Sequence, residues 1–283
     1  MGRARLGHYL LGIEGLALVR DWLVADPACA RARVAETRKL LAGFDAGVPA
    51  IEIDVPELEV RTGYAAWSET YDATPNPLIR VEEPVVRRLI DETPVGRALD
   101  AACGTGRHAG YLRARGHQVV GVDATPEMLA RARAAHPGVD FRVGSLTALP
   151  LDTASVDLAV CALALCHVTD LASAMVELAR VVRPGGRVIV SEFHPLMYRL
   201  GGQVLFRGSD GAFALVRSRG HGVGDYVRAA VASGLEVRDC FEPCWGEDEA
   251  RITAGPLYDA APEAFRAALV GLPGAVVFHL RRR

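Results

Sequence analysis

Lysine is almost absent from this sequence of 283 residues, in which Lys39 is the only one. One lysine near the N-terminus leaves none in the body of the chain for a Schiff base or a phosphate-binding Walker loop. No apolar run reaches the roughly eighteen residues of a membrane-spanning helix. The formal net charge of -2 provides no positive field to attract nucleic acid or an anionic membrane. We therefore expect a protein that binds neither nucleic acid nor membrane.

Paired cysteines are also missing. The six cysteines form no CxxC motif, and Cys240 and Cys244 have no second Cys or His pair at zinc-ligand spacing. Several cysteines lie within apolar runs, where they act as small hydrophobic residues. These features predict a reducing, cytoplasmic setting and no metal site. Half of the residues are hydrophobic, which is enough for a full globular core.

A glycine-containing turn follows the most regular apolar strand. The strand ends at Asp100, Gly104 and Gly106 come next, and a second apolar run closes with Asp123. Close glycines let the backbone approach a ligand, and a carboxylate at the end of the next strand can accept hydrogen bonds from a ribose. The pattern predicts a nucleoside pocket. The same pattern occurs in dinucleotide-dependent dehydrogenases and in S-adenosylmethionine-dependent enzymes.

Buried strands alternate with helices over most of the chain. Such alternation predicts an α/β fold with a doubly wound, mostly parallel sheet. The strands are expected at 97–102, 118–122, 139–143, 156–161, 186–192, 235–241 and 274–280. The helices are expected at 82–92, 105–115, 126–135, 170–182, 223–233 and 259–270.

Two segments stand outside this alternation. Residues 9–24 and 29–43 have helical periodicity and lead through a connection at 44–62, which predicts an N-terminal helical extension or cap over residues 1–62. The main domain is then expected over residues 63–283. Apolar stretches flank the turn at 209–211, which predicts a hairpin within a cap insertion at about 195–222.

Four motifs now occur in a recognisable order. They are Leu99-Asp-Ala-Ala-Cys-Gly-Thr-Gly106, Val120-Gly-Val-Asp123, Val156-Asp-Leu-Ala-Val160 and Arg183-Pro-Gly-Gly-Arg187. The series resembles that of class I S-adenosylmethionine-dependent methyltransferases, over residues 97–193 above all. The resemblance implies a seven-stranded Rossmann-like sheet, with S-adenosylmethionine as cofactor and S-adenosylhomocysteine as product.

The same resemblance implies which residues hold the cofactor. Asp100 and backbone carbonyls of the turn would bind the methionine ammonium, and Asp123 both ribose hydroxyls. Many relatives have an acidic residue where this chain has Ser145, so that the contact to the adenine amino group is weaker or moves to the backbone. The full cofactor-binding set is Tyr64, Tyr71, Asp100, Ala102, Gly104, Gly106, Asp123, Ala124, Met128, Ser145, Leu146, Ala162 and Leu163.

An aromatic stripe precedes the main domain. Tyr64, Trp67 and Tyr71 are spaced to share one helical face, and the segment resembles the tyrosine-containing helix that closes over the cofactor in this family. A stripe of this kind equally predicts plain core packing. The polar residues that follow, Arg80, Glu82 and Glu83, are interpreted as a solvated helix face.

The acceptor side has three candidate histidines. His167 follows the fourth strand, His194 closes the fifth, and His221 precedes a helix that carries Tyr226. Related methyltransferases often have a histidine near the transferred methyl at the place of His167. A histidine pKa lies near neutrality, which suits a general base. A lone histidine more often caps a helix or forms a hydrogen bond within the core. The three histidines and Tyr226 are therefore treated as candidate catalytic residues.

The resulting hypothesis is methyl transfer from S-adenosylmethionine to a small, apolar or aromatic acceptor in specialised metabolism, at carbon or nitrogen, with an indole-like ring as one example. O-methylation of a small phenol or polyketide stays open, as does a cofactor-binding homologue or partner subunit without methyl transfer. A nicotinamide oxidoreductase is disfavoured because Ala109 replaces the third glycine of GxGxxG and Lys39 cannot complete a Tyr-x-x-x-Lys motif. The sequence leaves a homodimer open.

Overall fold

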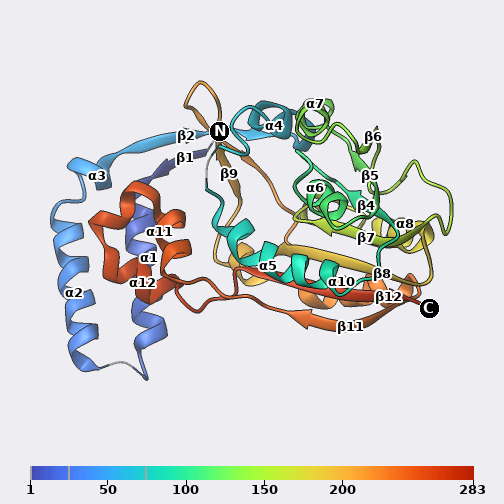
Figure 1. Cartoon of the computed structure of the whole chain (residues 1–283). Coiled ribbons are helices and arrows are strands. Elements are labelled where there is room, and N and C mark those ends of the chain that lie inside the picture. Colours follow the sequence, from blue (N-terminus) through green and yellow to red (C-terminus); the bar gives the residue numbers. More distant parts are fainter. Residues whose placement is uncertain (1, 25, 74) are drawn as a thin grey trace. The chain divides into compact units, whose positions relative to one another are not determined.

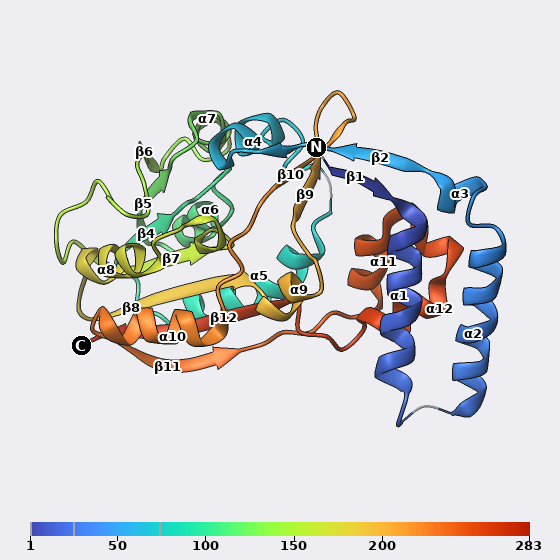
Figure 2. The same cartoon turned by 180° about the vertical axis from the view of Figure 1, so that it is seen from behind.

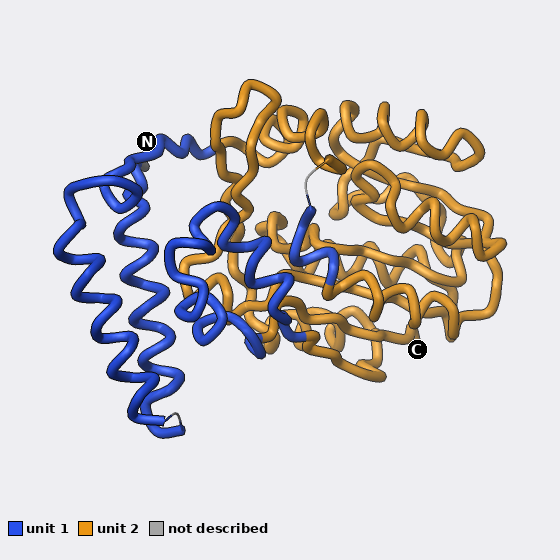
Figure 3. Tube along the Cα trace, turned by 60° about the vertical axis from the view of Figure 1, so that its left-hand side comes forward, with its two compact units in different colours: residues 1–57, 75–80, 244–272 blue, residues 58–74, 81–243, 273–283 orange. Residues whose placement is uncertain are grey.

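The structure is a computed structural model that describes residues 2–24, 26–73 and 75–283. It divides into two compact units (Figure 3). The helical unit comprises residues 1–57, 75–80 and 244–272, and the sheet unit comprises residues 58–74, 81–243 and 273–283. This division differs from the boundary expected at residue 62, because the chain returns to the helical unit near its C-terminus. Whether the helical unit acts as a cap stays a proposal.

Seven strands form the sheet of the sheet unit, in the order β11-β12-β8-β7-β4-β5-β6. Strands β8, β7, β4, β5 and β6 run parallel to one another. Strand β12 is antiparallel to β8, and β11 is antiparallel to β12. This confirms the expected doubly wound, mostly parallel Rossmann-like sheet. Its strands are β4 (Arg97–Ala101), β5 (Gln118–Asp123), β6 (Asp140–Val143), β7 (Val156–Ala162), β8 (Val182–Phe193), β11 (Leu235–Phe241) and β12 (Ala275–Arg282).

Helices cover both faces of this sheet because successive strand residues point to opposite sides. Leu99 packs in the core beneath α8 (Leu171–Val181) and α10 (Val223–Ala232), whereas its neighbour Ala98 packs beneath α5 (Pro77–Asp91), α6 (Arg107–Ala114) and α7 (Pro126–Ala135). Figure 1 shows α5 and α6 in front of the sheet, and Figure 2 shows α8 and α10 in front of it from behind. Burial on both sides explains why the strands are continuous apolar runs.

The strand order reverses at β4. From β4 the chain moves outward through β5 and β6, and then returns to pair β7 on the other side of β4. In open α/β sheets, ligands bind at the carboxyl ends of the strands at such a switch point. The turns that follow β4 and β7 are therefore where a site is expected.

A second, smaller sheet carries the order β3-β10-β9. β9 (Val204–Arg207) and β10 (Phe213–Val216) pair antiparallel, which confirms the hairpin expected from the sequence; β3 spans Glu57–Leu58. Buried Phe206 and Val216 pack there against Tyr64 and Trp67 of α4 (Val60–Trp67). Two short elements, the 3-10 turn η1 (Leu165–His167) and α9 (Pro195–Arg199), lie between these parts in the sequence.

The helical unit is built around α1 (Leu6–Asp21). Arg20 donates from its guanidinium to the carbonyl oxygens of Ala267, Ala268 and Val270 at the end of α12 (Pro262–Leu269), where unpaired carbonyls favour a cation. The helix expected at 259–270 begins at Pro262. It is preceded by a helix that was not expected, α11 (Glu247–Ala254), and by the 3-10 turn η2 (Gly255–Ala260). The other elements are β1 (Gly2–Arg5), α2 (Pro27–Ala42), α3 (Gly47–Ala50) and β2 (Glu52–Val55). None of the described helices is long and apolar enough to cross a membrane.

Close packing of α6 supplies a test of the fold. A Cβ at Gly110 would lie 2.3 Å from the ring of His136. We expect Gly110→Ala to lower the free energy of unfolding by about 1–3 kcal/mol because the imidazole must move. In Gly224→Ala of α10 the new methyl meets only the flexible end of Arg228, so the change should be within about 1 kcal/mol. Urea unfolding of both variants measures this, and equal effects would contradict the packing.

Candidate functional site

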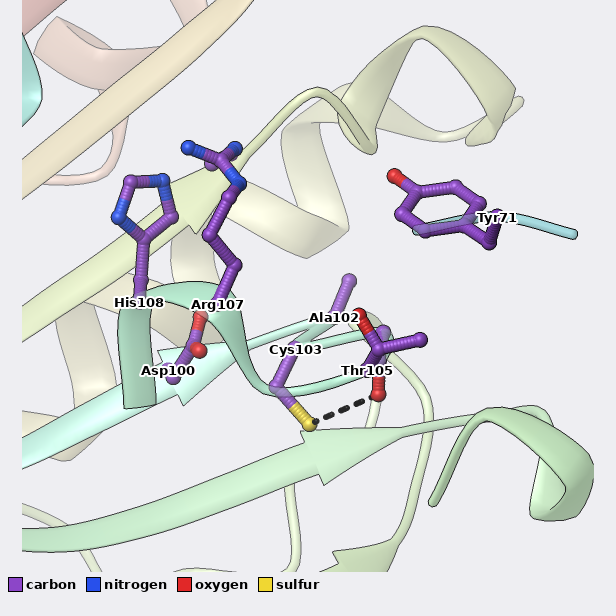
Figure 4. A pocket seen from close by; sticks show the side chains of 9 residues that line it. Tyr71, Asp100, Ala102, Cys103, Thr105, Arg107 and His108 are labelled. Carbon is purple, nitrogen blue, oxygen red and sulfur yellow. Dashed lines mark hydrogen bonds between the residues drawn. The ribbon is translucent and has the colours of Figure 1, made fainter. Parts of the chain in front are cut away.

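A pocket opens where β4 and β7 end, at the switch point of the sheet (Figure 4). Its walls come from the turn after β4, the first turn of α6, the end of β7 and the segment after α4. The lining residues are Tyr71, Asp100, Ala102, Cys103, Gly104, Thr105, Arg107, His108 and Ala162. Five of these, Tyr71, Asp100, Ala102, Gly104 and Ala162, belong to the set expected to bind the cofactor.

The backbone of the turn after β4 is held in left-handed conformations. Ala102 has φ 56°, Gly104 has φ 54° and Gly106 has φ 89°. A Cβ at Gly104 would meet nothing within 4 Å, so this glycine faces open space. A Cβ at Gly106 would instead lie 2.8 Å from the ring of His136. Gly104 therefore leaves room for a ligand, whereas Gly106 lets α6 pack closely.

Two carboxylates border the turn. Asp123 accepts hydrogen bonds from the backbone N–H groups of Gly104 and Thr125, both at 2.8 Å. Asp100 is buried and accepts from the N–H of Ala109 at 2.7 Å, which ties β4 to α6. Burial raises the pKa of Asp100 to about 6 and raises that of Asp123 as well. Each carboxylate keeps lone pairs for a ligand beyond the backbone bonds that fix it.

A buried ion-pair network lies behind the pocket. Glu82 of α5 is fully buried and accepts from Arg107 at 3.0 Å and from the hydroxyl of Ser191 at 2.6 Å, with Nε2 of His108 at 3.3 Å. Burial alone would raise the pKa of Glu82, but Arg107 and His108 outweigh it and hold the pKa at about 2. The interpretation of Glu82 as part of a solvated face was wrong. The network fixes the Arg107 guanidinium at the pocket wall.

The segment after α4 is anchored over the pocket. The hydroxyl of Thr105 donates to Asp72 at 2.9 Å, and the hydroxyl of Thr70 donates to the carbonyl oxygen of Arg207 at 2.9 Å. Between them Tyr71 lines the pocket, opposite Arg107 and His108 in Figure 4. The aromatic stripe thus contributes a pocket wall through Tyr71, whereas Tyr64 and Trp67 pack on the small sheet.

That packing is close. The Trp67 ring stacks on the Phe206 ring with their centroids 5.1 Å apart. It lies edge-on to the Tyr71 ring with their centroids 4.7 Å apart. Tyr64 lies 5.7 Å from Trp67 and 5.4 Å from the ring of His167. An aromatic cluster of these five residues therefore adjoins the pocket through Tyr71.

Tyr64 and His167 form a hydrogen-bonded pair within that cluster. The Tyr64 hydroxyl lies 2.9 Å from Nε2 of His167, whose Nδ1 is 3.5 Å from the carbonyl oxygen of Arg217. Burial lowers the pKa of His167 and raises that of Tyr64 well above its ordinary value. Both groups are therefore neutral near pH 7. With its proton on Nδ1, His167 accepts the hydrogen bond that Tyr64 donates.

The turn after β7 is fixed by two residues of β8. Leu163 has φ 58° and donates its N–H to the carbonyl oxygen of Ser191 at 2.7 Å. The next three N–H groups, of Ala164, Leu165 and Cys166, donate to the buried carboxylate of Glu192 at 3.2, 2.6 and 3.2 Å. This strained turn connects Ala162 in the pocket to His167.

The other candidates for catalysis occupy structural positions. His194 caps α9, since Nδ1 accepts from the N–H of Leu196 at 3.2 Å while Nε2 contacts Glu242 at 2.8 Å. His221 donates from Nε2 to the carbonyl oxygen of Val168 at 2.8 Å. Tyr226 is only 1% exposed and packs on Phe278 in the core. Of the four candidates, His167 belongs to the aromatic cluster that adjoins the pocket. Tyr226 was expected on the acceptor side, but it is a core residue.

The residues expected around adenine follow β5 and β6. Ala124 and Ser145 are exposed, Leu146 is half-buried, and Met128 is buried in the first turn of α7. The Ser145 hydroxyl contacts that of Thr147 at 3.0 Å. The parallel neighbours β5 and β6 place these turns along one edge of the sheet, beside Asp123.

Three residues that shape the site were missed in the sequence, although each left a signal. Arg107 stands at the first position of α6, where the helix dipole disfavours a cation, so it needs a buried anion nearby. Glu82 shares the apolar face of α5 with Val86, Leu89 and Ile90. Glu192 interrupts an apolar strand. For Glu82 and Glu192 the signal is a charge inside an apolar pattern, and for Arg107 it is a cation at a helix N-terminus.

The pocket suits a nucleoside with a charged amino-acid tail. The open space beside Gly104 would be filled by a Cβ and is free for a ligand. Asp123 ends β5, where its carboxylate can accept hydrogen bonds from a diol. Asp100 and Arg107 line the pocket and offer a negative and a positive charge. S-adenosylmethionine has this combination of groups. Fold and pocket together are those expected of a class I methyltransferase domain.

Comparisons with known proteins agree. Residues 99–190 match the methyltransferase domain family. A malonyl-acyl-carrier-protein O-methyltransferase of Erwinia billingiae is 41% identical over 95 residues, which are 34% of this chain and 38% of that protein. A demethylmenaquinone methyltransferase of Renibacterium salmoninarum is 35% identical over 142 residues, 48% of this chain and 60% of that protein. The solved structure of an S-adenosylmethionine-dependent methyltransferase from Mesorhizobium loti has a TM-score of 0.53 at 28% identity, covering 71% of this chain and 98% of that one.

The family match lies within the sheet unit, and the chain spans less than half the length of the first curated relatives that it matches. The sheet unit is a class I S-adenosylmethionine-dependent methyltransferase domain, and S-adenosylmethionine is its cofactor.

Placement of the glycine turn can be tested at Gly104. Gly104→Asp should leave the protein folded, at a backbone cost of about 1–2 kcal/mol, because the new side chain meets no protein atom. Its carboxylate would fill the pocket beside Asp100 and Asp123, so affinity for S-adenosylhomocysteine should fall at least about a hundredfold, or about 2.7 kcal/mol. Calorimetry measures it. In Gly234→Asp, which also has positive φ and open space, the affinity should persist; retained binding in Gly104→Asp would refute the placement.

The buried network predicts a pH-dependent stability. Glu82→Gln should lower the free energy of unfolding by about 3–5 kcal/mol, because Arg107 and His108 lose their buried anion. The pKa of Glu82 is lowered from 4.5 to about 2, so its contribution is complete above the unfolded value and disappears as pH falls through the folded one. The stability difference between wild type and variant should therefore be constant near neutral pH and shrink between pH 4.5 and about 2. A difference independent of pH would exclude an ionised Glu82.

Proposed function

We propose that this protein transfers the methyl group of S-adenosylmethionine to a small, largely apolar or aromatic acceptor that loses a proton. The observation that carries the proposal is the aromatic cluster with its neutral Tyr64–His167 pair, which adjoins the pocket of a methyltransferase domain. The cofactor supplies an electrophilic methyl group on a sulfonium. The protein must hold the two reactants in line and accept a proton.

The cofactor would be held by residues of the sheet unit. Asp123 would accept from the ribose hydroxyls, Asp100 would bind the ammonium and Arg107 the carboxylate of the amino-acid tail. The cofactor would meet only the backbone of four residues, Ala102, Gly104, Ala162 and Leu163. Ala124, Met128, Ser145 and Leu146 would surround adenine, and Tyr71 would close the pocket.

Tyr64 and His167 would manage the proton. His167 is neutral because burial lowers its pKa, and its Nε2 accepts the Tyr64 hydrogen bond. An acceptor X–H that donates to the Tyr64 oxygen can lose its proton to Tyr64 while Tyr64 passes its own to Nε2. Tyr64 ends neutral and His167 ends protonated, so the charges balance and no phenolate is required.

The acceptor would lie against Tyr64, Trp67 and Phe206. Apolar rings around a single polar pair favour a small aromatic or apolar molecule, as an indole-like ring would be, methylated at carbon or nitrogen. O-methylation of a small phenol or polyketide uses the same proton acceptor and stays the second candidate. One of the relatives is itself an O-methyltransferase. A homologue without methyl transfer, or a homodimer that completes the pocket, is left to experiment.

The test has two stages. Calorimetry should first show binding of S-adenosylhomocysteine and none of a nicotinamide nucleotide. Methyl-labelled S-adenosylmethionine is then incubated with indoles, phenols and polyketide-like acceptors, and labelled product is sought by extraction. Failure to bind S-adenosylhomocysteine would refute the proposal, and binding without transfer to any small acceptor would favour the homologue that does not methylate.

His167 gives the sharper prediction. His167→Gln should reduce turnover about a hundredfold with little change in affinity for S-adenosylhomocysteine, because a proton acceptor is lost while the cofactor pocket is intact. Tyr64→Phe should behave alike. His194→Gln serves as the control, since both nitrogens of His194 have structural partners. Equal turnover in wild type and His167→Gln, with an active acceptor, would remove His167 from the mechanism.

A further inference from the structure

Glu192 is a buried carboxylate that the proposed mechanism does not use. It is 0% exposed near the end of β8, and no described lysine, arginine or histidine forms an ion pair with it. Its partners are the three backbone N–H groups of Ala164, Leu165 and Cys166, together with the Cys166 thiol. A buried charge without a cation is costly and needs a reason.

The direction of these hydrogen bonds matters. In a trans peptide the C=O points opposite to the N–H. Because the N–H of Ala164 points at Glu192, the carbonyl oxygen of Leu163 points away from Glu192. Leu163 follows Ala162, which lines the pocket, and is itself held in a strained conformation by Ser191. The carboxylate and the aligned peptide thus present negative charge at the same end of β7.

The strand register places Glu192 close to the pocket, because Ala162 of the pocket wall pairs with Ser191, the residue before Glu192. Glu192 and Asp123 both raise the pKa of Tyr64, and Glu192, Asp100 and Asp123 all raise that of Cys161. Burial raises the pKa of Glu192 to about 7, against which the N–H groups act. The titratable groups that face it are Tyr64, Cys161, Cys166, Tyr198 and Tyr226, none of which is a cation.

Methyl transfer changes the charge in this region. The bond between carbon and sulfur breaks, its electron pair stays on sulfur, and a lone pair of the acceptor forms the new bond to carbon. The sulfonium thereby becomes a neutral thioether, while the proton of the acceptor goes to the protein. A site with an uncompensated negative charge can distinguish the cofactor before transfer from the product after it.

We infer that Glu192 is a positioning residue that orients the Leu163–Cys166 turn and supplies the anion by which the pocket prefers the cationic S-adenosylmethionine over the neutral S-adenosylhomocysteine. This inference rests on the proposed function. It also accounts for product release: once the sulfonium charge is lost, the ligand loses its attraction to Glu192. Asp100 and Asp123 would contact groups that both ligands share, so their contributions cancel in the ratio of the two affinities.

Calorimetry on the full chain tests this without an acceptor. In Glu192→Gln the affinity for S-adenosylmethionine, and for its cationic analogue sinefungin, should fall about tenfold while that for S-adenosylhomocysteine changes less than about twofold. Glu14→Gln is the matched control, because Glu14 is also a buried glutamate, paired with Arg33 in the helical unit. An equal loss for all three ligands would overturn the inference and leave Glu192 a structural residue.

The wild-type protein supplies a second measurement in case Glu192→Gln does not fold. The ratio of S-adenosylmethionine to S-adenosylhomocysteine affinity should fall as pH decreases from about 8 to about 6, because protonation removes the charge of Glu192. Binding of S-adenosylmethionine alone should release protons near pH 7, as seen in buffers of different ionisation enthalpy. A ratio independent of pH would overturn the inference. Absence of binding by either ligand would instead refute the proposed function.

Discussion

Backbone N–H groups, rather than cations, hold the carboxylates at the carboxyl ends of the sheet. Asp100 is bound by Ala109, Asp123 by Gly104 and Thr125, and Glu192 by the turn after β7. An acceptor that is buried must be satisfied, so each carboxylate dictates the path of the chain that surrounds it. The turns after β4 and β7 adopt left-handed conformations to meet this demand. The outcome is a pocket with Asp100 in its wall and two further carboxylates, Asp123 and Glu192, near the ends of β5 and β8, while Arg107 supplies a positive charge.

Glu82, which pairs with cations, has a different task. Glu82 reaches across from α5 to Arg107, His108 and Ser191, and so joins a helix, the glycine turn and the sheet in one buried network. Arg107 is thereby fixed at the pocket wall although it begins a helix. Cation pairing holds Glu82 in place here, while the N–H-bound carboxylates are the ones that we propose recognise the ligand. The same residue type has two functions, set by its partners.

The acceptor side is built from a separate set of contacts. The hairpin of β9 and β10 packs on α4 through Phe206 and Trp67, and this packing carries Tyr64 to His167. An apolar cluster around a single polar pair lowers the pKa of His167 and keeps it neutral. Stability of the hairpin and availability of the proton acceptor therefore depend on the same aromatic contacts.

The sequence by itself determined the parallel sheet and the glycine turn, since strand periodicity, the close glycines and the strand-end Asp123 are local in the chain. The order of the four motifs indicated the methyl donor through their resemblance to a known family. The sequence also indicated the hairpin. It could not determine the charges behind the pocket or the surroundings of each histidine, because Glu82, Glu192 and His167 contact partners that are distant in sequence. It likewise missed the return of residues 244–272 to the helical unit. Only tertiary structure decided these points, because burial and the pairing of a charge depend on what other elements bring beside it.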